Sequence, residues 1–172
     1  MSTTKPVLTS DEIEFLDHSN RIEDERSKEA MEDAINAWKY AKTIEVMTVP
    51  DLLEIHRLLL HRIAPHIAGV FREHDIRIGG KTKRFIGKDL LKGQVENVLV
   101  DLNKGEEFGL AAQRAGYARK IHVAYENVHP FPDGNGRSGR ILYNWQRVRM
   151  GLPVHVIHEG EEQMAYYDWF QD

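Results

Sequence analysis

Residues 129–140, His129-Pro130-Phe131-Pro132-Asp133-Gly134-Asn135-Gly136-Arg137-Ser138-Gly139-Arg140, are the most informative stretch of this chain. Twelve residues bring together an imidazole, a carboxylate, an amide, two guanidinium groups and three glycines. A hydrophobic core has no use for this mixture, because buried polar groups cost free energy unless each finds a partner. We therefore interpret the stretch as a loop that wraps a polyphosphate and carries chemistry beside it.

Two glycines and two arginines in this loop predict a site for phosphate. Gly134 and Gly136 permit a positive φ and a close approach of the backbone to a ligand. Their N–H groups, with the start of a helix expected near Arg137, favour an anion. Arg137 and Arg140 lie three residues apart, so on the first turn of a helix they point to the same side. Their guanidinium groups match the geometry of phosphate oxygens.

The remaining side chains of the loop divide between chemistry and anchoring. His129 titrates near neutral pH and can accept a proton from an attacking hydroxyl. General-base catalysis of this kind typically accelerates a reaction by about 10²–10⁴. Asp133 offers a hard oxygen ligand, which suits Mg²⁺ held jointly with phosphates. Phe131 has no polar role, and we expect it to anchor the loop in the core.

The loop resembles the motif H-x-F-x-[D/E]-G-N-G-R-x-x-R of the Fic family, with every defined position present. At about 5% per residue type, the eight defined positions would arise by chance in roughly one in 10⁸ chains of this length. The preceding helix, an upstream hairpin and the segment Ile141-Leu142-Tyr143-Asn144 also look like the family, so the resemblance covers most of residues 10–170. It implies a single compact Fic-type helical domain, residues 1–172, with one small β-hairpin.

In Fic proteins, the motif histidine deprotonates a hydroxyl of a target protein, whose oxygen attacks the α-phosphate of ATP and receives AMP. The resemblance thus implies a protein adenylyltransferase that uses ATP and Mg²⁺ and modifies a Tyr, Thr or Ser side chain. By position, His129 is the catalytic base and Asp133 the Mg²⁺ ligand, while two aromatic residues fall where relatives place rings beside the adenine. The residues expected around the nucleotide are Asp133, Gly134, Asn135, Gly136, Arg137, Ser138, Gly139, Arg140, Tyr166 and Tyr167.

Ser19-Asn20-Arg21-Ile22-Glu23 resembles the inhibitory motif [S/T]-x-x-x-E-[G/N] that many Fic proteins carry on a helix. Here the helix is expected over about residues 10–24, ahead of the core, as in one class of the family. In the family this glutamate pairs with the second motif arginine and keeps it from the γ-phosphate, so Glu23 would pair with Arg140, with Ser19 as the first position of the motif. Asp24 departs from the pattern, which has Gly or Asn there. The alternative is an ordinary surface helix.

Apolar residues at helical spacing predict an all-α fold around the loop. Thr9-Ser10-Asp11-Glu12 looks like an N-cap followed by acidic first-turn residues. Thr48-Val49-Pro50-Asp51 starts another helix, and Gly151-Leu152-Pro153 ends the one that follows the loop. The stripes expected to face the core are Ala30, Met31, Ala34, Ile35 and Trp38; Leu52, Ile55, Leu59 and Ile63; Val95, Val98, Leu99 and Leu102; Tyr117, Ala118, Ile121 and Tyr125 in a helix over about 110–127; Ile141, Trp145 and Val148; and Met164, Tyr167 and Phe170.

The pattern changes over residues 69–87. Ile76-Arg77-Ile78 alternates, Gly79-Gly80 can turn and Lys83-Arg84-Phe85-Ile86 follows, which predicts a small β-hairpin. It resembles the flap of Fic proteins, where an extended target segment can add to the edge through backbone hydrogen bonds. The basic residues Lys81, Lys83 and Arg84 indicate an acidic partner, a contact to ATP or merely a solvated edge. The residues expected to dock the target protein are Ile76, Ile78, Arg84 and Phe85.

Composition excludes several classes of protein. A chain of 172 residues is long enough for one domain with a real core. Its net charge of −4 and pI of about 6.1 argue against nucleic acid as a partner. The absence of cysteine excludes disulfides, thiolate chemistry and zinc ribbons. The N-terminus lacks the apolar core of a signal peptide, and no apolar stretch approaches the ~18 residues that span a bilayer, so we expect a cytoplasmic protein with no membrane partner. The number of subunits stays open, and a homo-oligomer is compatible with the sequence.

Seven of the eight other histidines are scattered along the chain, and no pair of these seven has a metal-binding pattern with a carboxylate. His122 lies seven residues before His129, so it either lines the site or packs in the core. These seven are His56, His61, His66, His74, His122, His155 and His158.

Three alternatives to AMP transfer stay open at this stage. Some relatives with the inhibitory glutamate use it to position water, so the chain could remove AMP from a modified protein. It could also transfer UMP, phosphate or phosphocholine, although the intact glycine and second arginine positions favour ordinary ATP orientation. The non-enzyme alternative is a nucleotide-binding interaction module silenced by its own helix.

Overall fold

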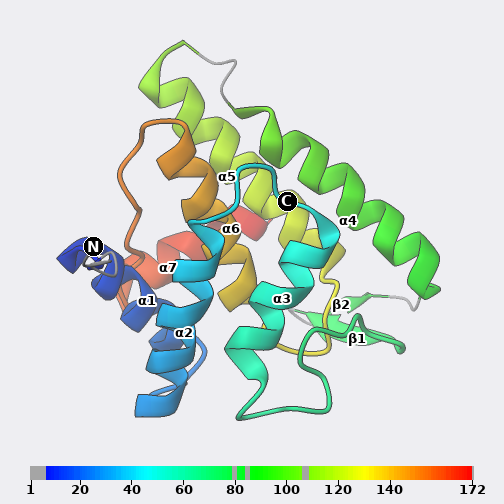
Figure 1. The fold of residues 1–172 in the computed structure, drawn as a ribbon. Coiled ribbons are helices and arrows are strands. Elements are labelled where there is room, and N and C mark those ends of the chain that lie inside the picture. The colour runs from blue at the N-terminus through cyan, green and yellow to red at the C-terminus, as the bar shows by residue number, and fades with distance from the viewer. Residues whose placement is uncertain (1–6, 79–80, 84–85, 106–108, 172) are drawn as a thin grey trace, which may run out of the picture.

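The computed structural model describes residues 7–78, 81–83, 86–105 and 109–171, and within them it confirms the expected helical fold with one small hairpin (Figure 1). The hairpin lies between the third and fourth helices of the chain. The elements are α1 (Ser10–Ile22), α2 (Lys28–Ala41), α3 (Val49–Leu60), β1 (Ile76–Ile78), β2 (Lys81–Lys83), α4 (Lys88–Asn103), α5 (Ala111–Val128), α6 (Asn135–Arg149), α7 (Glu161–Tyr167) and the 3₁₀ turn η2 (Asp168–Phe170).

Helix α6, which carries most of the motif, is the centre of the domain. It contacts α1, α2, α3, α4 and α5, and every residue from Arg137 to Gln146 is buried. A helix that is buried on all sides must pair its own polar groups inside the protein, because water does not reach them. The position of α6 therefore places the motif arginines among neighbouring helices rather than on the surface.

Large apolar side chains from most of the helices form the main core around α6. Trp38 of α2 and Tyr125 of α5 are almost fully buried. Full burial of one large apolar side chain stabilises a protein by roughly 1.5–3 kcal/mol, so this core holds the helices in fixed relative positions. Other members with at most 2% exposure are Phe15, Leu16, Ala34, Ala37, Ala41, Met47, Leu52, Ile55, Leu59, Leu60, Val95, Phe131, Ile141 and Leu142.

Side-chain caps define where α1 and α3 begin. The Thr9 hydroxyl accepts from the N–H of Glu12, and the Glu12 carboxylate accepts from the N–H of Thr9 in return. Thr48 and Asp51 form the same reciprocal cap at α3, with Pro50 in the first turn. Both starts agree with the predictions, because capping residues satisfy N–H groups that have no partner within the helix.

The two short strands pair in antiparallel fashion, with Ile76 opposite Lys83, Arg77 opposite Thr82 and Ile78 opposite Lys81. This confirms a hairpin within residues 69–87. Gly79, Gly80, Arg84 and Phe85 lie outside the described residues, so the expected turn and two of the expected docking residues are not placed. Docking of a target on Ile76 and Ile78 stays a prediction.

Three parts of the predicted apolar stripes are wrong. Ile63 lies beyond the end of α3 and is 39% exposed, and Val148 near the end of α6 is 45% exposed. On α7, Met164 is 64% and Tyr167 38% exposed, whereas Tyr166 is buried at 4%. A helix of seven residues spans two turns, so the sequence pattern alone does not determine which of two adjacent tyrosines faces inward.

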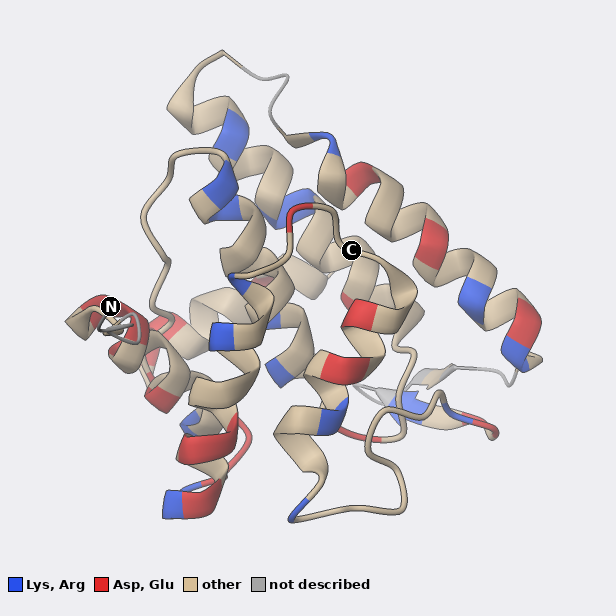
Figure 2. Ribbon diagram, viewed as in Figure 1, with Lys and Arg blue, Asp and Glu red and all other residues tan. Residues whose placement is uncertain are grey.

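In the ribbon of Figure 2, basic and acidic positions are interspersed along α4, whereas the charged positions of α6 are all basic. None of the helices within the described residues is both long and apolar enough to cross a membrane.

Candidate functional site

The loop after α5 turns sharply into α6. Gly134 caps α6 with φ +79, so this glycine adopts the positive φ that the sequence predicts. A Cβ at this position would lie 2.9 Å from Leu60 Cδ1 and 3.0 Å from His56 Nε2. Helix α6 begins at Asn135, two residues earlier than predicted, and its first N–H groups have no acceptors within the helix. The loop therefore ends at a helix terminus whose N–H groups favour an anion.

Asn135 holds the loop closed. Its side-chain Oδ1 accepts from the N–H of Phe131 at 2.9 Å, and its Nδ2 donates to the carbonyl of Phe131 at 2.8 Å. Phe131 is fully buried, as predicted for an anchor. The amide of Asn135 is thus used within the loop, and contact of this residue with a nucleotide, expected from the family, stays a prediction for its backbone.

His56 supports the loop from α3, a role that the sequence did not reveal. It stacks on Phe131 with ring centroids 3.6 Å apart. Its Nδ1 accepts from the N–H of Gly69 at 2.8 Å, so its Nε2 carries the proton and donates to the carbonyl of Asp133 at 2.8 Å. Burial lowers the pKa of His56 to about 4, which keeps the ring neutral. The sequence feature that could have indicated this role is the position of His56 on the apolar helix face that Leu52 and Leu59 define.

His129 sits at the C-cap of α5 in the left-handed conformation, with φ 50 and ψ 64. Few residues other than glycine adopt this conformation, and it often marks functional sites. Buried Arg72 secures it: its Nε donates to the carbonyl of His129 at 2.8 Å, and its N–H donates to the carbonyl of Pro130 at 2.9 Å. The segment before β1 is thereby joined to His129. No sequence signal marks Arg72, which is 57 positions from His129.

Arg137 and Asp133 form the more open side of the loop. The carboxylate of Asp133 is 71% exposed, its Oδ1 accepts from the N–H of Gly134 at 2.7 Å, and its Oδ2 lies 3.9 Å from Nη2 of Arg137. Arg137 is only 3% exposed, and its Nε has no hydrogen-bond partner among the described residues. A buried guanidinium donor without an acceptor fits an anionic ligand such as phosphate.

Arg140 is buried and fully engaged on the opposite side. Its Nε donates to Oγ of Ser19 at 2.8 Å, and its Nη2 donates to the carbonyl of Ser19 at 3.0 Å and to Oε1 of Glu23 at 2.7 Å. Its Nη1 donates to the hydroxyl of Tyr166 at 3.3 Å. The expected pairing of Arg140 with Glu23 is therefore present in the structure, and Ser19 contacts the same guanidinium.

Tyr166 links Arg140 to His122. Nδ1 of His122 donates to the carbonyl of Gly139 at 3.2 Å, so its Nε2 accepts from the Tyr166 hydroxyl at 2.8 Å. Burial lowers the pKa of His122 to about 3. His122 is thus a packed, neutral histidine that orients the tyrosine next to Arg140.

Glu23 lies against the first turn of α6. Gly136 belongs to that helix, so the positive φ expected for it is wrong. Its missing side chain matters for another reason: a Cβ there would collide with Oε1 of Glu23 and lie 2.8 Å from Nη1 of Arg140. The carboxylate of Glu23 thus lies where an anion is favoured, at a helix N-terminus beside a guanidinium.

Ser138 and Gly139 face the interior. The Ser138 hydroxyl is fully buried, donates to the carbonyl of Gly134 at 2.8 Å and meets the hydroxyl of Tyr125 at 2.7 Å. Gly139 packs against Tyr125. The structure therefore gives both residues a role in packing α6 on α5. Tyr167, expected near adenine, accepts from Nε2 of Gln163 at 2.9 Å on the exposed face of α7, and its contact with a nucleotide stays a prediction.

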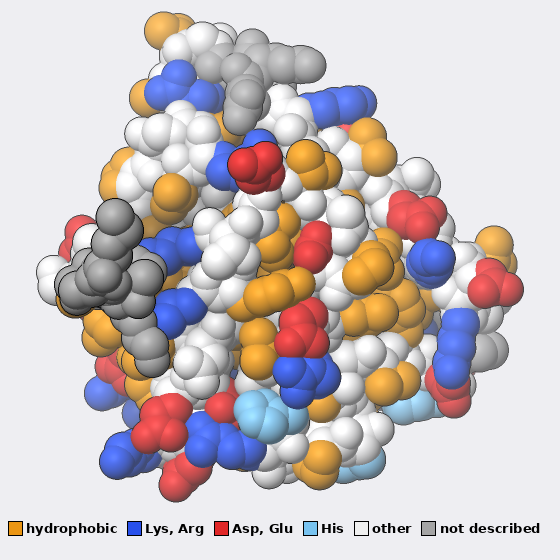
Figure 3. Space-filling view, in the orientation of Figure 1, with side chains coloured by type: hydrophobic (Ala, Val, Ile, Leu, Met, Phe, Trp, Pro, Cys, Tyr) orange, Lys and Arg blue, Asp and Glu red, His pale blue; other side chains and the backbone are white. Residues whose placement is uncertain are grey.

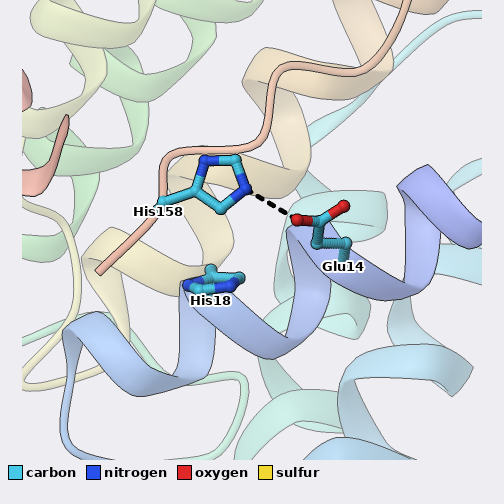
Figure 4. A group of neighbouring side chains, drawn as sticks. All are labelled: Glu14, His18 and His158. Atoms are coloured by element: carbon cyan, nitrogen blue, oxygen red, sulfur yellow. Dashed lines mark hydrogen bonds and ion pairs between the residues drawn. The ribbon is translucent and has the colours of Figure 1, made fainter. Parts of the chain in front are cut away.

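A second polar cluster joins α1 to the segment before α7 (Figure 4). Glu14, His18 and His158 have ligand atoms within 4.8 Å of one another, although the sequence separates His158 from Glu14 by 144 positions. Both ring nitrogens of His158 face carboxylates, at 2.6 Å from Glu14 and 2.7 Å from Glu162. His18 Nδ1 accepts from the N–H of Glu159 at 3.0 Å. Because Glu14, His18 and His158 are already hydrogen-bonded, to one another or to Glu159 and Glu162, the arrangement is a hydrogen-bonded contact, which we call the α1 clamp.

A hollow of about 310 Å³ lies elsewhere, between the start of α3 and α4. Hydrophobic side chains are exposed in this region of Figure 3. Its lining includes Pro50, Leu99 and Val100 and none of the motif residues. The chemistry of the chain is therefore not centred on this hollow.

A histidine in a left-handed cap, a helix start suited to an anion and two buried arginines form one candidate site. A sequence profile of the Fic/DOC family matches residues 46–146, more than half of the chain. The chain belongs to the Fic/DOC family. The matched Fic region ends inside α6 and includes both motif arginines.

Relatives and solved structures agree with this assignment. The chain is 36% identical over 138 residues to a protein adenylyltransferase Fic of Culex quinquefasciatus and 34% identical to that of Aedes aegypti, covering 80% of this chain and 26% of each relative. It therefore spans about a quarter of the length of these relatives. The Fic fold is shared with Fic-1 of C. elegans (TM-score 0.74, 20% identity, 100% of this chain and 60% of that one) and with a Fic domain protein of Bacteroides thetaiotaomicron (TM-score 0.73, 22% identity, 91% and 69%).

Proposed function

We propose that this Fic domain is a protein adenylyltransferase that transfers AMP from ATP to a Tyr, Thr or Ser hydroxyl of a target protein, and that Glu23 inhibits it. The carrying observation is the pairing of Glu23 with Arg140 at the start of α6, where the carboxylate takes the place of an anionic ligand. The names of the relatives support the reaction. The proposal places the reaction in the cytoplasm, where ATP and Mg²⁺ occur together.

In this mechanism His129 accepts the proton of the target hydroxyl. The hydroxyl oxygen forms a bond to the α-phosphorus, the bond from that phosphorus to the β-phosphate oxygen breaks, and pyrophosphate leaves. His129 then loses the proton to solvent. The first N–H groups of α6, with Arg137 and Arg140, stabilise the negative charge on the phosphates, which is usually the largest contribution to such reactions.

Asp133 is the residue that would hold Mg²⁺ together with phosphate oxygens. Its carboxylate is exposed and oriented by the N–H of Gly134, and a carboxylate oxygen is a preferred ligand of this ion. When bound, the ion supplies positive charge to the phosphates. Tyr166 holds Arg140 through its hydroxyl in this proposal, rather than binding adenine directly.

Inhibition follows from competition for Arg140. While Nη2 of Arg140 bonds Glu23, the γ-phosphate lacks that donor and ATP cannot adopt the productive pose. The target protein would dock on the hairpin, since the segment before β1 is hydrogen-bonded to His129 and Pro130 through Arg72.

The test compares ATP labelled at the α- and at the γ-phosphate, with Mg²⁺ and the Glu23→Gly variant. Label transferred to protein from the α position alone, and lost when His129→Ala is added, supports AMP transfer. Label from the γ position alone would mean phosphorylation. Transfer that survives His129→Ala would remove His129 from the mechanism.

Removal of AMP is the second candidate, because Glu23 is 38% exposed and able to meet water beside Arg140. Incubating an AMP-modified protein with the unmodified chain and with Glu23→Gly separates the two activities. Release of AMP only by the chain that keeps Glu23 would favour removal.

A further inference from the structure

Glu126 is a buried carboxyl group beside the base, and the mechanism above gives it no role. It lies on α5 three residues before His129, about one helical turn away. Its side chain is only 14% exposed, and its Oε2 lies 4.0 Å from Nδ1 of His129. Its Oε1 is buried and has no hydrogen-bond partner in the described part of the chain. Burial of a carboxyl group with incomplete partners costs free energy, so stability does not account for its position.

The neighbouring helix leaves space for this group. At Gly139 on α6, a Cβ would lie 2.5 Å from Oε1 of Glu126. Arg140 acts on Glu126 through its charge, but it gives its hydrogen bonds to other acceptors. Glu126 is therefore not half of a structural ion pair with Arg140. The charged and titratable groups that face Glu126 are Glu23 at the end of α1, Tyr125 and His129 at α5, Arg140 on α6 and Tyr166 on α7.

The same surroundings bring the titration of Glu126 close to neutral pH. Burial raises the pKa of Glu126 to about 7, with Arg140 lowering it and Glu23 raising it. A carboxyl group that changes charge in this range, next to a general base, is a common feature of catalytic sites.

We propose that Glu126 is a positioning residue for His129: its carboxylate accepts the Nδ1–H of the base and leaves Nε2 unprotonated for the target hydroxyl. This inference rests on the proposed role of His129. At 4.0 Å the two groups are not hydrogen-bonded, and we expect the distance to shorten when the ring takes up a proton, because a charged imidazolium attracts the carboxylate more strongly than the neutral ring does. The proton from the target hydroxyl goes to Nε2, while Nδ1 keeps its own and Glu126 stays ionised.

Two substitutions separate the charge of Glu126 from its hydrogen bond. Glu126→Met removes both at similar length, and Glu126→Gln keeps an oxygen acceptor but removes the charge. In the Glu23→Gly background, we expect kcat to fall about 10- to 100-fold for Met and less for Gln, with KM for ATP unchanged. The thermal midpoint should stay the same or rise in both variants, because a poorly partnered buried carboxyl group is removed.

The pH profile gives a readout that a packing role would not change. Below neutral pH, the rate of the parent should decline with the uptake of two protons, by His129 and by Glu126. The rates of both variants should decline with the uptake of a single proton, by His129. A lower thermal midpoint in both variants together with an unchanged profile would make Glu126 a packing residue and overturn the inference.

Ring ¹⁵N NMR of His129 distinguishes failure of this inference from failure of the proposed function, because it needs neither ATP nor a target. We expect the Nδ1–H tautomer in the parent and in Glu126→Gln, and a shift toward the Nε2–H tautomer in Glu126→Met. The same tautomer in all three would overturn the inference even in a chain that transfers AMP. A tautomer shift in a chain that transfers no AMP would support the inference and contradict only the proposed function. Glu96→Gln, exposed on α4, is the matched control.

Discussion

Nη2 of Arg140 donates a 2.7 Å hydrogen bond to Oε1 of Glu23 across 117 positions of sequence. Ser19, one turn earlier on α1, binds the same guanidinium through its hydroxyl and its carbonyl. Two residues of the inhibitory motif therefore hold the second arginine of the catalytic motif. Since Arg140 is buried while Glu23 is partly exposed, we expect an incoming phosphate to displace the carboxylate without unfolding α6.

Ser19→Ala should relieve inhibition in part. The variant removes one hydrogen bond from the guanidinium and leaves the carbonyl and Glu23 in place. A hydrogen bond to a charged group contributes about 1.5–3 kcal/mol, and the remaining contacts compensate for part of it, so we expect AMP transfer to rise about 3- to 10-fold, less than in Glu23→Gly. Initial rates with labelled ATP measure the effect, and Glu25→Gly is the control. A rate equal to that of the unmodified chain would show that Ser19 does not contribute to inhibition.

Asp24→Gly should stabilise the end of α1 without relieving inhibition. Asp24 has φ 56, a conformation that glycine adopts without strain and that other residues adopt at a cost of about 1 kcal/mol. The ion pair that Asp24 forms with Arg26 is exposed and contributes little. Urea unfolding should show a gain of up to about 1 kcal/mol for Gly and a loss for Asp24→Val. The opposite order would mean that Asp24 does not carry backbone strain.

The departure at Asp24 shows how the sequence and the structure complement each other. The motif loop was predictable, because each residue type in it has a defined chemical use at a defined spacing. The pairing of Glu23 with Arg140 was implied by the resemblance of residues 19–24 to the inhibitory motif of the family. The φ of Asp24 explains why Gly or Asn is usual there, since both adopt the left-handed conformation readily. Asp shares this tolerance, so the departure leaves the geometry of the motif intact.

Other parts of the site depend on contacts that no local pattern records. Arg72 reaches the carbonyl of His129 from a segment 57 positions away, and His158 reaches α1 from the other end of the chain. Gly136 was expected to adopt a positive φ, which it does not. A glycine is needed at this position because the carboxylate of Glu23 occupies the space that a Cβ would fill. Such roles arise only when the helices have packed, and hydrophobic spacing alone does not specify which polar atoms then meet.

Acid should destabilise the protein through His122. Burial lowers its pKa to about 3, against about 6.5 in the unfolded chain. As pH falls below 6.5, the unfolded chain takes up a proton that the native state does not, so the free energy of unfolding decreases by about 1.4 kcal/mol per pH unit from this group. His56, with a pKa of about 4, acts in the same direction. In urea unfolding between pH 6.5 and 4.5, the free energy of unfolding of His122→Gln should depend less steeply on pH than that of the parent. The exposed His66→Gln should keep the original slope, and an equal slope in all three would contradict buried, neutral histidines.

The α1 clamp should respond to pH in the opposite sense. Hydrogen bonds to Glu14 and Glu162 raise the pKa of His158, so the stabilisation is fully present below pH 6.5 and is lost as pH rises through the native pKa. Hydrogen-exchange protection factors of α1 should therefore fall as pH increases from 6 toward 9, and His158→Asn should remove this dependence. His18, Glu159 and Arg26 also take part in this contact. The loss of amide protection should appear in α1 and not in α4. If the pH-dependent loss of protection persists in His158→Asn, it arises from another titratable group.

Tyr166→Phe and Tyr167→Phe form a matched pair that tests the orientation of α7. The Tyr166 hydroxyl donates to Nε2 of His122 and accepts from Arg140, so its removal leaves a buried acceptor and a buried donor short of a partner. We expect a loss of about 1–3 kcal/mol in the free energy of unfolding. The Tyr167 hydroxyl meets only Gln163 at the exposed face, and its removal should cost less than about 0.5 kcal/mol. In the Glu23→Gly background, Tyr166→Phe should also lower AMP transfer, because Arg140 loses the contact that holds its Nη1, whereas Tyr167→Phe should not. Equal effects of the two substitutions on stability and transfer would show that the hydroxyl of Tyr166 does not position Arg140.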